Sequence, residues 1–175
     1  ILDTVYAFDK QPLPSGKRVA IITGPGGPAV GTTDTCIEMG LEVPRLSDAT
    51  KEKLRKVMPP VGTSAENPID LSLASVVTPN VYTDVVKVLG EDDAIDMIMV
   101  IGIGGDEFHR VILNAADGLT KPLVTAIIMP LESVVKDYKA LMKGGVPVYP
   151  DPRRAAKALA RLSSYAGFLR DRQSA

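Results

Sequence analysis

The sequence is short of cysteine and histidine, with one of each among its 175 residues. One cysteine rules out an internal disulfide and a metal site built from cysteines. A reducing, cytoplasmic setting is therefore the default expectation. The one histidine has no serine or cysteine partner in a recognisable motif, so the sequence gives no basis for a catalytic triad.

Neither sign of charge is in excess, because 20 Lys and Arg residues stand against 21 Asp and Glu residues. Basic residues do not cluster with interleaved aromatics, so no nucleic-acid partner is expected. Apolar runs such as residues 95–103 are too short to span a bilayer, and no membrane partner is expected either. An initiating Met and a signal peptide are also missing, and Ile1 as the first residue suggests a piece of a longer chain.

Hydrophobic residues are plentiful: they make up 45% of the chain, enough for the core of one domain. Prolines and glycine between Gln11 and Gly16 are typical of a linker. We therefore expect residues 1–16 to be the end of a preceding helix and a linker, and residues 17–175 to form the domain.

Short apolar runs rich in β-branched residues alternate with stretches that suit helices. Strands are predicted at residues 19–23, 41–46, 95–103, 122–128 and 146–149. Helices are predicted at residues 2–8, 29–39, 50–58, 78–89, 106–116, 131–142 and 152–169. Residues 59–75 are predicted to be a long loop, and Asp92, Asp93 and Asp96 to lie in a solvated loop before the third strand.

This alternation predicts a three-layer α/β/α fold, in which helices cover both faces of a five-stranded parallel sheet. The strand order can be flavodoxin-like, 2-1-3-4-5, or that of a small Rossmann fold, 3-2-1-4-5, and the pattern fits both. In both orders a ligand binds beyond the carboxyl ends of the strands, beside the first strand. The turns after strands one and three meet at that place.

The turn after the first strand, Thr23-Gly24-Pro25-Gly26-Gly27-Pro28, opens a helix. The N–H groups at a helix start attract an anion, usually a phosphate or a carboxylate. With Ala29 the turn also fits the G-x-G-x-x-A pattern of a dinucleotide site. The acidic residue that such a site needs at the end of strand two is missing, because Glu42 lies near its start and Arg45 near its end. The structural alternative is a tight turn that needs glycine to bring the helix close to the sheet.

The other candidate residues each have a structural explanation beside a functional one. Gly104 and Gly105 after the third strand either let a backbone approach a ligand or make an ordinary turn. Asn67–Leu71 is either a loop anchor or a wall of the anion site. His109 fits a surface or capping residue, and Cys36 a small buried apolar residue. No Walker A lysine follows either turn, which disfavours a P-loop NTPase.

Three segments, Pro12–Pro28, Asn67–Leu71 and Gly144–Ala156, resemble in order and spacing the third domain of NDP-forming (ADP-forming) acyl-CoA synthetases. The same domain is similar to the C-terminal domain of the succinyl-CoA synthetase β subunit. There, a Gly-Thr-x-Asp segment matches Gly31–Asp34, and a Gly-Gly turn that opens a helix matches Gly104-Gly105.

The resemblance implies a flavodoxin-like fold and a part of an acid–CoA ligase. The family reaction converts acyl-CoA, ADP and phosphate into acid, CoA and ATP with Mg²⁺, through an acyl phosphate and a phosphohistidine. The histidine loop, the CoA-binding domain and the ATP-grasp domain are absent from this sequence, and His109 is not the phosphorylated residue. CoA, ATP or ADP and Mg²⁺ are thus implied for the complete enzyme, and the isolated chain is expected to be inactive.

Carried onto this sequence, the resemblance implies an acid or acyl-phosphate pocket but no catalytic residue and no metal ligand. The pocket residues are Thr23, Gly24, Gly26 and Gly27, with Asn67 and Asp70 as a further wall, and Gly104 and Gly105 facing the phosphate. Asp106 and Glu107 depart from the pattern, because acids there compete with a phosphate for the same N–H groups. Either they point away, or this helix has lost its phosphate role.

Two other functions stay open on the sequence. The same domain can serve as a regulatory part of an acyl-CoA-dependent protein lysine acetyltransferase. Alternatively, the glycine turn can belong to a nucleotide, dinucleotide or flavin-binding module.

Overall fold

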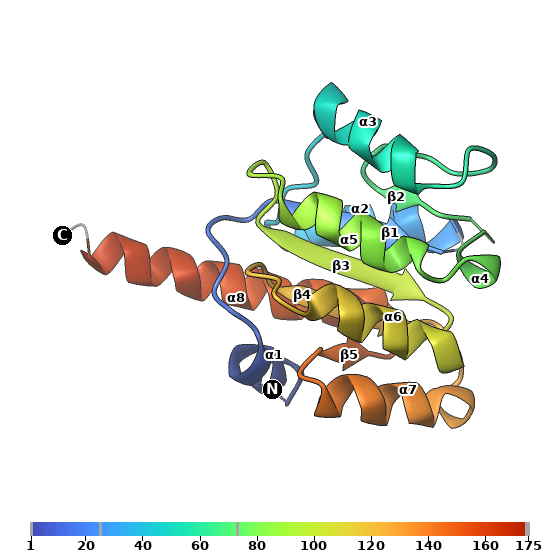
Figure 1. Ribbon diagram of the computed structural model, residues 1–175. Helices are drawn as coiled ribbons and strands as arrows, with labels where there is room; N and C mark the ends of the chain where they lie inside the picture. The colour runs from blue at the N-terminus through green and yellow to red at the C-terminus, as the bar shows by residue number, and fades with distance from the viewer. Residues whose placement is uncertain (1, 25, 73, 174–175) are drawn as a thin grey trace.

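A five-stranded parallel sheet forms the middle layer of the computed structural model, which describes residues 2–24, 26–72 and 74–173 (Figure 1). The strands are β1 (Val19–Thr23), β2 (Ile69–Asp70), β3 (Met97–Gly102), β4 (Leu123–Ile127) and β5 (Val148–Tyr149). Their order is β2-β1-β3-β4-β5, and every neighbouring pair is parallel. This order is flavodoxin-like, which confirms the predicted three-layer fold and decides against the Rossmann order.

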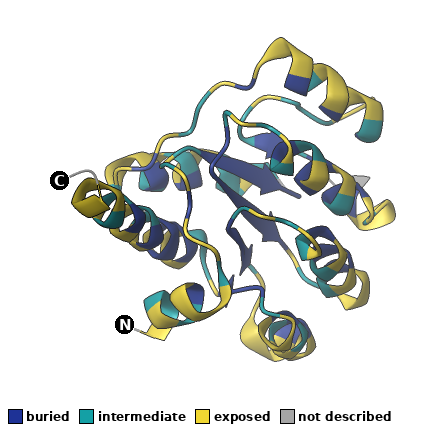
Figure 2. Ribbon diagram, turned by 60° about the vertical axis from the view of Figure 1, so that its left-hand side comes forward, coloured by how far each residue is buried: buried dark blue, intermediate teal, exposed yellow. Residues whose placement is uncertain are grey.

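Helices cover both faces of the sheet. They are α1 (Leu2–Lys10), α2 (Gly27–Glu38), α3 (Asp48–Val57), α4 (Ala74–Val77), α5 (Val81–Gly90), α6 (Asp106–Ala116), α7 (Leu131–Lys143) and α8 (Pro152–Gln173). One hydrophobic cluster joins the sheet to α3, α5, α6 and α7, and a second joins it to α1, α2 and α8 (Figure 1). The central strands β1 and β3 are buried along their whole length (Figure 2). Within the described residues, no helix is both long and apolar enough to cross a membrane.

The prediction for the second strand was wrong. Residues 41–46, all of which the structure describes, form no strand, and only Glu42 makes a bridge, with Arg18 just before β1. One reason is Pro44, which has no N–H group to donate to a neighbouring strand. The second strand is instead β2, which is two residues long and lies within residues 59–75, the segment predicted as a loop.

The Asn67 side chain takes the place of the missing strand at the edge of β1. Its Oδ1 accepts a hydrogen bond from the Ile21 amide, and its Nδ2 donates to the carbonyls of Val19 and Pro44, each at 3.0 Å. An amide side chain thus satisfies the backbone groups that a strand would otherwise pair with, and β2 follows directly after it.

The other elements lie within a few residues of their predicted bounds, and α6 matches its prediction at both ends. The Ser47 hydroxyl caps α3 by accepting a hydrogen bond from the Thr50 amide at 3.1 Å. Gly27, rather than Ala29, begins α2, and the short helix α4 precedes α5. Cys36 is fully buried, as predicted, and burial raises the pKa of its thiol to about 12.

The segment before β1 packs onto the rest of the domain. The Arg154 guanidinium in α8 binds both carboxylate oxygens of Asp3 in α1, at 2.6 Å each. The Gln11 side chain accepts a hydrogen bond from the Leu123 amide at the start of β4, at 2.7 Å. A domain boundary at residue 16 stays a prediction.

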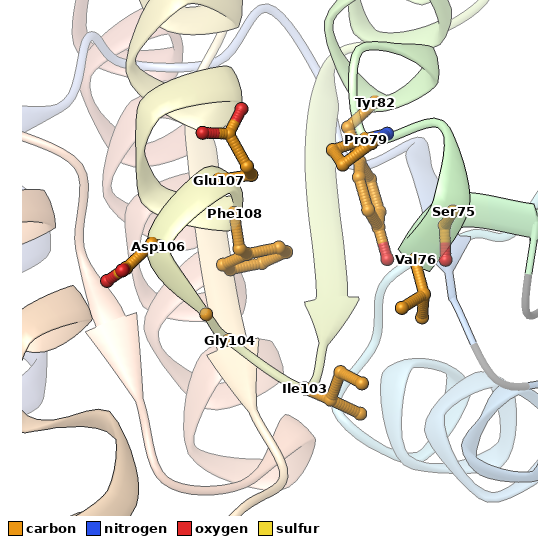
Figure 3. A pocket seen from close by; sticks show the side chains of 10 residues that line it. Ser75, Val76, Pro79, Tyr82, Ile103, Gly104, Asp106, Glu107 and Phe108 are labelled. Atoms are coloured by element: carbon orange, nitrogen blue, oxygen red, sulfur yellow. The ribbon is translucent and has the colours of Figure 1, made fainter.

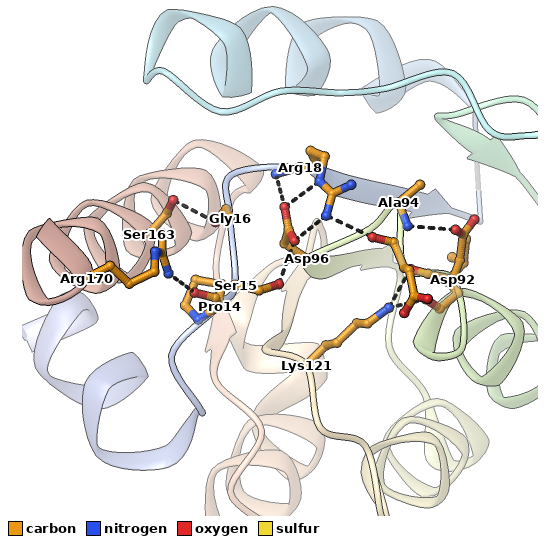
Figure 4. Close-up of polar contacts among 12 residues, drawn as sticks. Pro14, Ser15, Gly16, Arg18, Asp92, Ala94, Asp96, Lys121, Ser163 and Arg170 are labelled. Carbon is orange, nitrogen blue, oxygen red and sulfur yellow. Dashed lines mark hydrogen bonds and ion pairs between the residues drawn. The ribbon is translucent and has the colours of Figure 1, made fainter. Parts of the chain in front are cut away.

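Asp96 was expected in a solvated loop, but it is buried just before β3 (Figure 4). Its carboxylate accepts three hydrogen bonds from Arg18, from the amide at 2.9 Å, Nε at 2.8 Å and Nη2 at 2.7 Å, and one from Ser15 Oγ at 2.7 Å. Burial by itself raises the pKa of Asp96, but these hydrogen bonds outweigh burial and hold the pKa at about 2. The carboxylate therefore fastens the entry to β1 against the start of β3.

We expect Asp96→Asn to lower the free energy of unfolding at neutral pH by about 2–3 kcal/mol, because the hydrogen-bonded charge is lost. The folded-state pKa of about 2 lies below the unfolded value of about 3.9, so the carboxylate stabilises the fold fully above about pH 4. This stabilisation is lost as the pH falls towards 2. Urea unfolding of wild type and variant at several pH values should show the difference shrinking in that window, and a constant difference would contradict the assignment.

Candidate functional site

The two glycine turns lie side by side at the carboxyl edge of the sheet, as the sequence predicted. β1 pairs with β3 so that Thr23 lies opposite Ile101, and the Gly24 amide donates to the Ile101 carbonyl at 3.0 Å. Since α2 and α6 pack on opposite faces of the sheet, the two helix starts flank this edge from both sides (Figure 1).

No side chain among the described residues caps the N–H groups at the start of α2. Gly26 is the N-cap residue and provides no side-chain cap, Pro28 lies in the first turn, and no acidic side chain is present there. Uncapped N–H groups and the positive end of the helix dipole favour an anion. Pro25, the remaining residue of the turn, lies outside the described residues.

Packing accounts for two glycines of this turn but not for a third. A Cβ on Gly24 would lie 2.5 Å from the Tyr82 hydroxyl, and a Cβ on Gly26 would lie 2.3 Å from Asp70 Oδ2. A Cβ on Gly27 would meet no atom of the described residues within 4 Å. The structural alternative, a turn that needs glycine for close packing, therefore fits Gly24 and Gly26 and leaves Gly27 unexplained.

Thr23, the last residue of β1, has a fully buried side chain whose hydroxyl finds no hydrogen-bond partner in the described part of the chain. Such a hydroxyl is unusual, because burying an unpaired polar group costs about 1–3 kcal/mol. The hydroxyl lies at the end of β1, next in sequence to the first glycine turn.

Asn67 and Asp70 do not come together at the site. The Asn67 amide is engaged with the backbone at the edge of β1, as a loop anchor would be. Asp70 lies beside Gly26, where its Oδ1 accepts a hydrogen bond from the Ser72 amide at 2.7 Å. Its charge would weaken the binding of an anion at this turn unless a cation accompanied the anion.

The second turn borders a cavity of about 230 Å³ between α6 and the α4–α5 segment (Figure 3). The cavity is lined by Ser75, Val76, Pro79, Tyr82, Ile103, Gly104, Gly105, Asp106, Glu107 and Phe108. Tyr82 and Phe108 form an edge-to-face pair with ring centroids 5.4 Å apart. Burial raises the pKa of the Tyr82 phenol, which keeps it a neutral donor. No sequence pattern marks Ser75, Tyr82 or Phe108, because they meet only in the folded chain.

The two acids after Gly105 are engaged with basic side chains. Asp106 pairs with Lys136 of α7 at 2.7 Å and points away from the cavity (Figure 3). Hydrogen bonding to Lys136 lowers the pKa of Asp106. Glu107 pairs with Arg110 on its own helix. The charge of each acid at the start of α6 is thus balanced by a neighbouring base.

His109 was expected to be a surface or capping residue, but only 15% of its side chain is exposed, and it makes no cap hydrogen bond to the described residues at the start of α6. Its Nδ1 lies 2.9 Å from Oδ1 of Asp137 in α7, and Oδ2 of Asp137 accepts a hydrogen bond from the Gly105 amide at 3.1 Å. Asp137 could not be singled out from the sequence, because the residues it contacts are about 30 positions away.

The described residues contain no group of three or more His, Cys, Asp or Glu side chains suited to a metal ion. The site offers instead backbone amide donors at two helix starts. This donor set suits a phosphate or a carboxylate group.

Comparison with known proteins places the chain in a family of CoA-ligase domains. Residues 19–166 match the family described as the Ligase-CoA domain. The acetate–CoA ligase [ADP-forming] II subunit alpha of Pyrococcus furiosus is 34% identical over 90% of this chain and 35% of its own length. The 4-hydroxybutyrate–CoA ligase [ADP-forming] of Nitrosopumilus maritimus is 29% identical over 97% of this chain and 24% of its own length.

Two solved structures have a fold similar to that of this chain. A crystal structure of a Pyrococcus horikoshii protein superposes with a TM-score of 0.85 at 31% identity, over 95% of this chain and 39% of that chain. The dinucleotide-forming acetyl-coenzyme A synthetase 1 of Ca. Korarchaeum cryptofilum, in complex with phosphate and ADP, gives a TM-score of 0.81 at 25% identity, over 94% of this chain and 36% of that chain. The chain thus spans about a quarter to two fifths of these relatives. With its five parallel strands in flavodoxin-like order, the chain belongs to the Ligase-CoA domain family, whose relatives named here include ADP-forming acyl-CoA ligases.

Proposed function

We propose that this chain is the domain of an ADP-forming acyl-CoA ligase that supplies N–H and O–H donors to the acid and acyl-phosphate pocket. The observation that carries the proposal is the pair of glycine turns joined through Gly24 and Ile101, with an uncapped helix start beside one of them. Uncapped amides at α2 suit the negative oxygens of an acyl phosphate.

The unpaired Thr23 hydroxyl supports the same assignment. It is buried at the end of β1, next in sequence to the turn whose amides would bind the anion. A hydrogen bond from this hydroxyl to a charged group is worth about 1.5–3 kcal/mol, which offsets the cost of leaving it unpaired in the free domain.

The complete reaction requires domains outside this chain. We propose that a CoA-binding domain and an ATP-grasp domain, on the same chain or on a partner subunit, provide the phosphorylated histidine and the sites for CoA and nucleotide. Mg²⁺ would take its ligands chiefly from those domains and from the phosphates, because the described residues offer no cluster of three ligands. A cation bound beside the anion would also offset the charge of Asp70.

The first prediction concerns the chain alone. We expect no formation of acyl-CoA when the 175-residue chain is incubated with acid, ATP, CoA and Mg²⁺, because the histidine loop is missing. A coupled CoA-consumption assay measures this, and turnover by the chain alone would contradict the proposal. Tight binding of NAD or FMN to the chain would instead favour a dinucleotide or flavin module, and a fused acetyltransferase domain in the longer gene would favour the regulatory function.

The second prediction separates a binding role of Gly27 from a structural one. In the complete enzyme, Gly27→Ala should reduce kcat/KM about tenfold, because the added methyl group stands at the helix start where the ligand would approach. Its melting temperature should not fall, since a Cβ there has open space. Gly31→Ala is the matched control, because it makes the same change in open space one turn further along α2 and should leave turnover unchanged. Equal effects of the two substitutions would contradict a binding role for Gly27.

The third prediction concerns Thr23→Val, which removes the unpaired hydroxyl and keeps the shape of the side chain. The free energy of unfolding without ligand should stay constant or rise by about 1 kcal/mol, because the hydroxyl has no hydrogen bond to any described residue to lose. Turnover of the complete enzyme should fall about tenfold, since the ligand loses a hydrogen bond. A variant that is destabilised but fully active would show that the hydroxyl has a structural role instead.

A further inference from the structure

Asp137 links the second glycine turn to His109, and the proposed function does not use it. The aspartate lies in α7, with 5% of its side chain exposed. One carboxylate oxygen accepts the hydrogen bond from the Gly105 amide, and the other is paired with Nδ1 of His109. Because an ionised carboxylate only accepts hydrogen bonds, Nδ1 is the donor in this pair.

The backbone of the turn also rests directly on α7. Gly104 and Gly105 have φ angles of +76° and +115°, which side chains with a Cβ rarely adopt. A Cβ on Gly104 would lie 2.7 Å from Val134 Cγ1 and 3.2 Å from Asp137 Oδ2. α7 leaves helical geometry at Val134, about one turn before Asp137. Packing against α7 therefore constrains Gly104, and a hydrogen bond to an α7 carboxylate constrains Gly105.

The hydrogen bond from Gly105 fixes the start of α6, because Gly105 is its N-cap residue. In a capping box, the side chain at the third helical position accepts the N-cap amide. Here the third position is Phe108, whose ring lines the cavity, so the acceptor comes from a different helix. With the Gly105 amide engaged, the amides of Asp106 and Glu107 are the next ones that a ligand can reach.

We infer that Asp137, oriented by His109, is a positioning residue that holds the start of α6 so that its next two amides face the ligand pocket. The inference rests on the proposed function for the nature of the ligand, an acid or its acyl phosphate. Whether removal of Asp137 strengthens or weakens ligand binding distinguishes a positioning role from a purely electrostatic one. A buried negative charge by itself repels an anion, so removing it would strengthen binding if charge were its only contribution. Positioning predicts weaker binding instead.

The test compares Asp137→Ala with Asp137→Asn in the complete enzyme. Asn keeps an oxygen that can accept from the Gly105 amide, and its NH₂ group can donate to His109 in the other tautomer. We expect Asp137→Ala to lower kcat/KM about tenfold, mainly through a higher KM for the acid, and Asp137→Asn to stay within about threefold of wild type. Asp96→Asn is the matched control, since it alters another buried, hydrogen-bonded aspartate at the opposite end of the sheet and should lose stability without losing kcat/KM.

The Gly105 amide provides a readout that does not depend on turnover. In the 175-residue chain labelled with [15N]glycine, the Gly105 amide proton should move upfield in Asp137→Ala, stay near its wild-type position in Asp137→Asn, and be unaffected by Asp96→Asn. An unmoved Gly105 signal in Asp137→Ala would overturn the inference, and so would a loss of kcat/KM no larger than that of Asp96→Asn. If the wild-type enzyme shows no ligase turnover, the proposed function fails separately, and the Gly105 signal decides whether Asp137 holds the turn.

Discussion

The pairing of β1 with β3 is the constraint on which the rest of this structure depends. Five residues of each strand pair in parallel, from Val19 opposite Met97 to Thr23 opposite Ile101, and both strands are buried throughout. A slip of one residue would turn each buried side chain to the other face and would also separate the two glycine turns. The same register brings Asp96 to Arg18 at the other end of the strands. One register thus fixes a polar anchor at one edge of the sheet and a candidate anion site at the opposite edge.

Much of the fold could be predicted from local pattern, because β1, β3 and β4 are continuous apolar runs and α6 follows a glycine turn. The second strand could not. Residues 41–46 look like a strand locally, but the edge of β1 is satisfied by the amide of Asn67, which is distant in sequence. Asp96 is a second example. A charged residue in a polar run predicts a solvated loop, and only the fold brings its partners Arg18 and Ser15 to it. In both cases a long-range hydrogen bond outweighs the local pattern.

Part of the candidate site could likewise be predicted from the sequence, and part could not. The glycine turns could be predicted because glycine next to a buried strand is a local signal, and their meeting follows from the strand order. The side chains that surround them could not be predicted. Tyr82, Phe108 and Asp137 belong to helices with an ordinary amphipathic sequence pattern, and only the packing of these helices brings them to the turns. The unpaired hydroxyl of Thr23 is visible only once the burial of its neighbours is known.

The two helix starts at the site differ in charge, and this difference bears on what each can do. The described first turn of α2 has no acidic side chain and no side-chain cap, but the Asp70 carboxylate lies beside Gly26. The positive end of the α2 dipole therefore attracts an anion only when a cation offsets the charge of Asp70. At the start of α6, Asp106 and Glu107 pair with Lys136 and Arg110, and Asp137 is hydrogen-bonded to His109. The charges of Asp106 and Glu107 are balanced, and the Gly105 amide is already hydrogen-bonded. The start of α6 is therefore a fixed wall of the site rather than its main source of attraction for an anion. An anion accompanied by a cation would draw electrostatic stabilisation from α2, whereas α6 would set the direction of its approach.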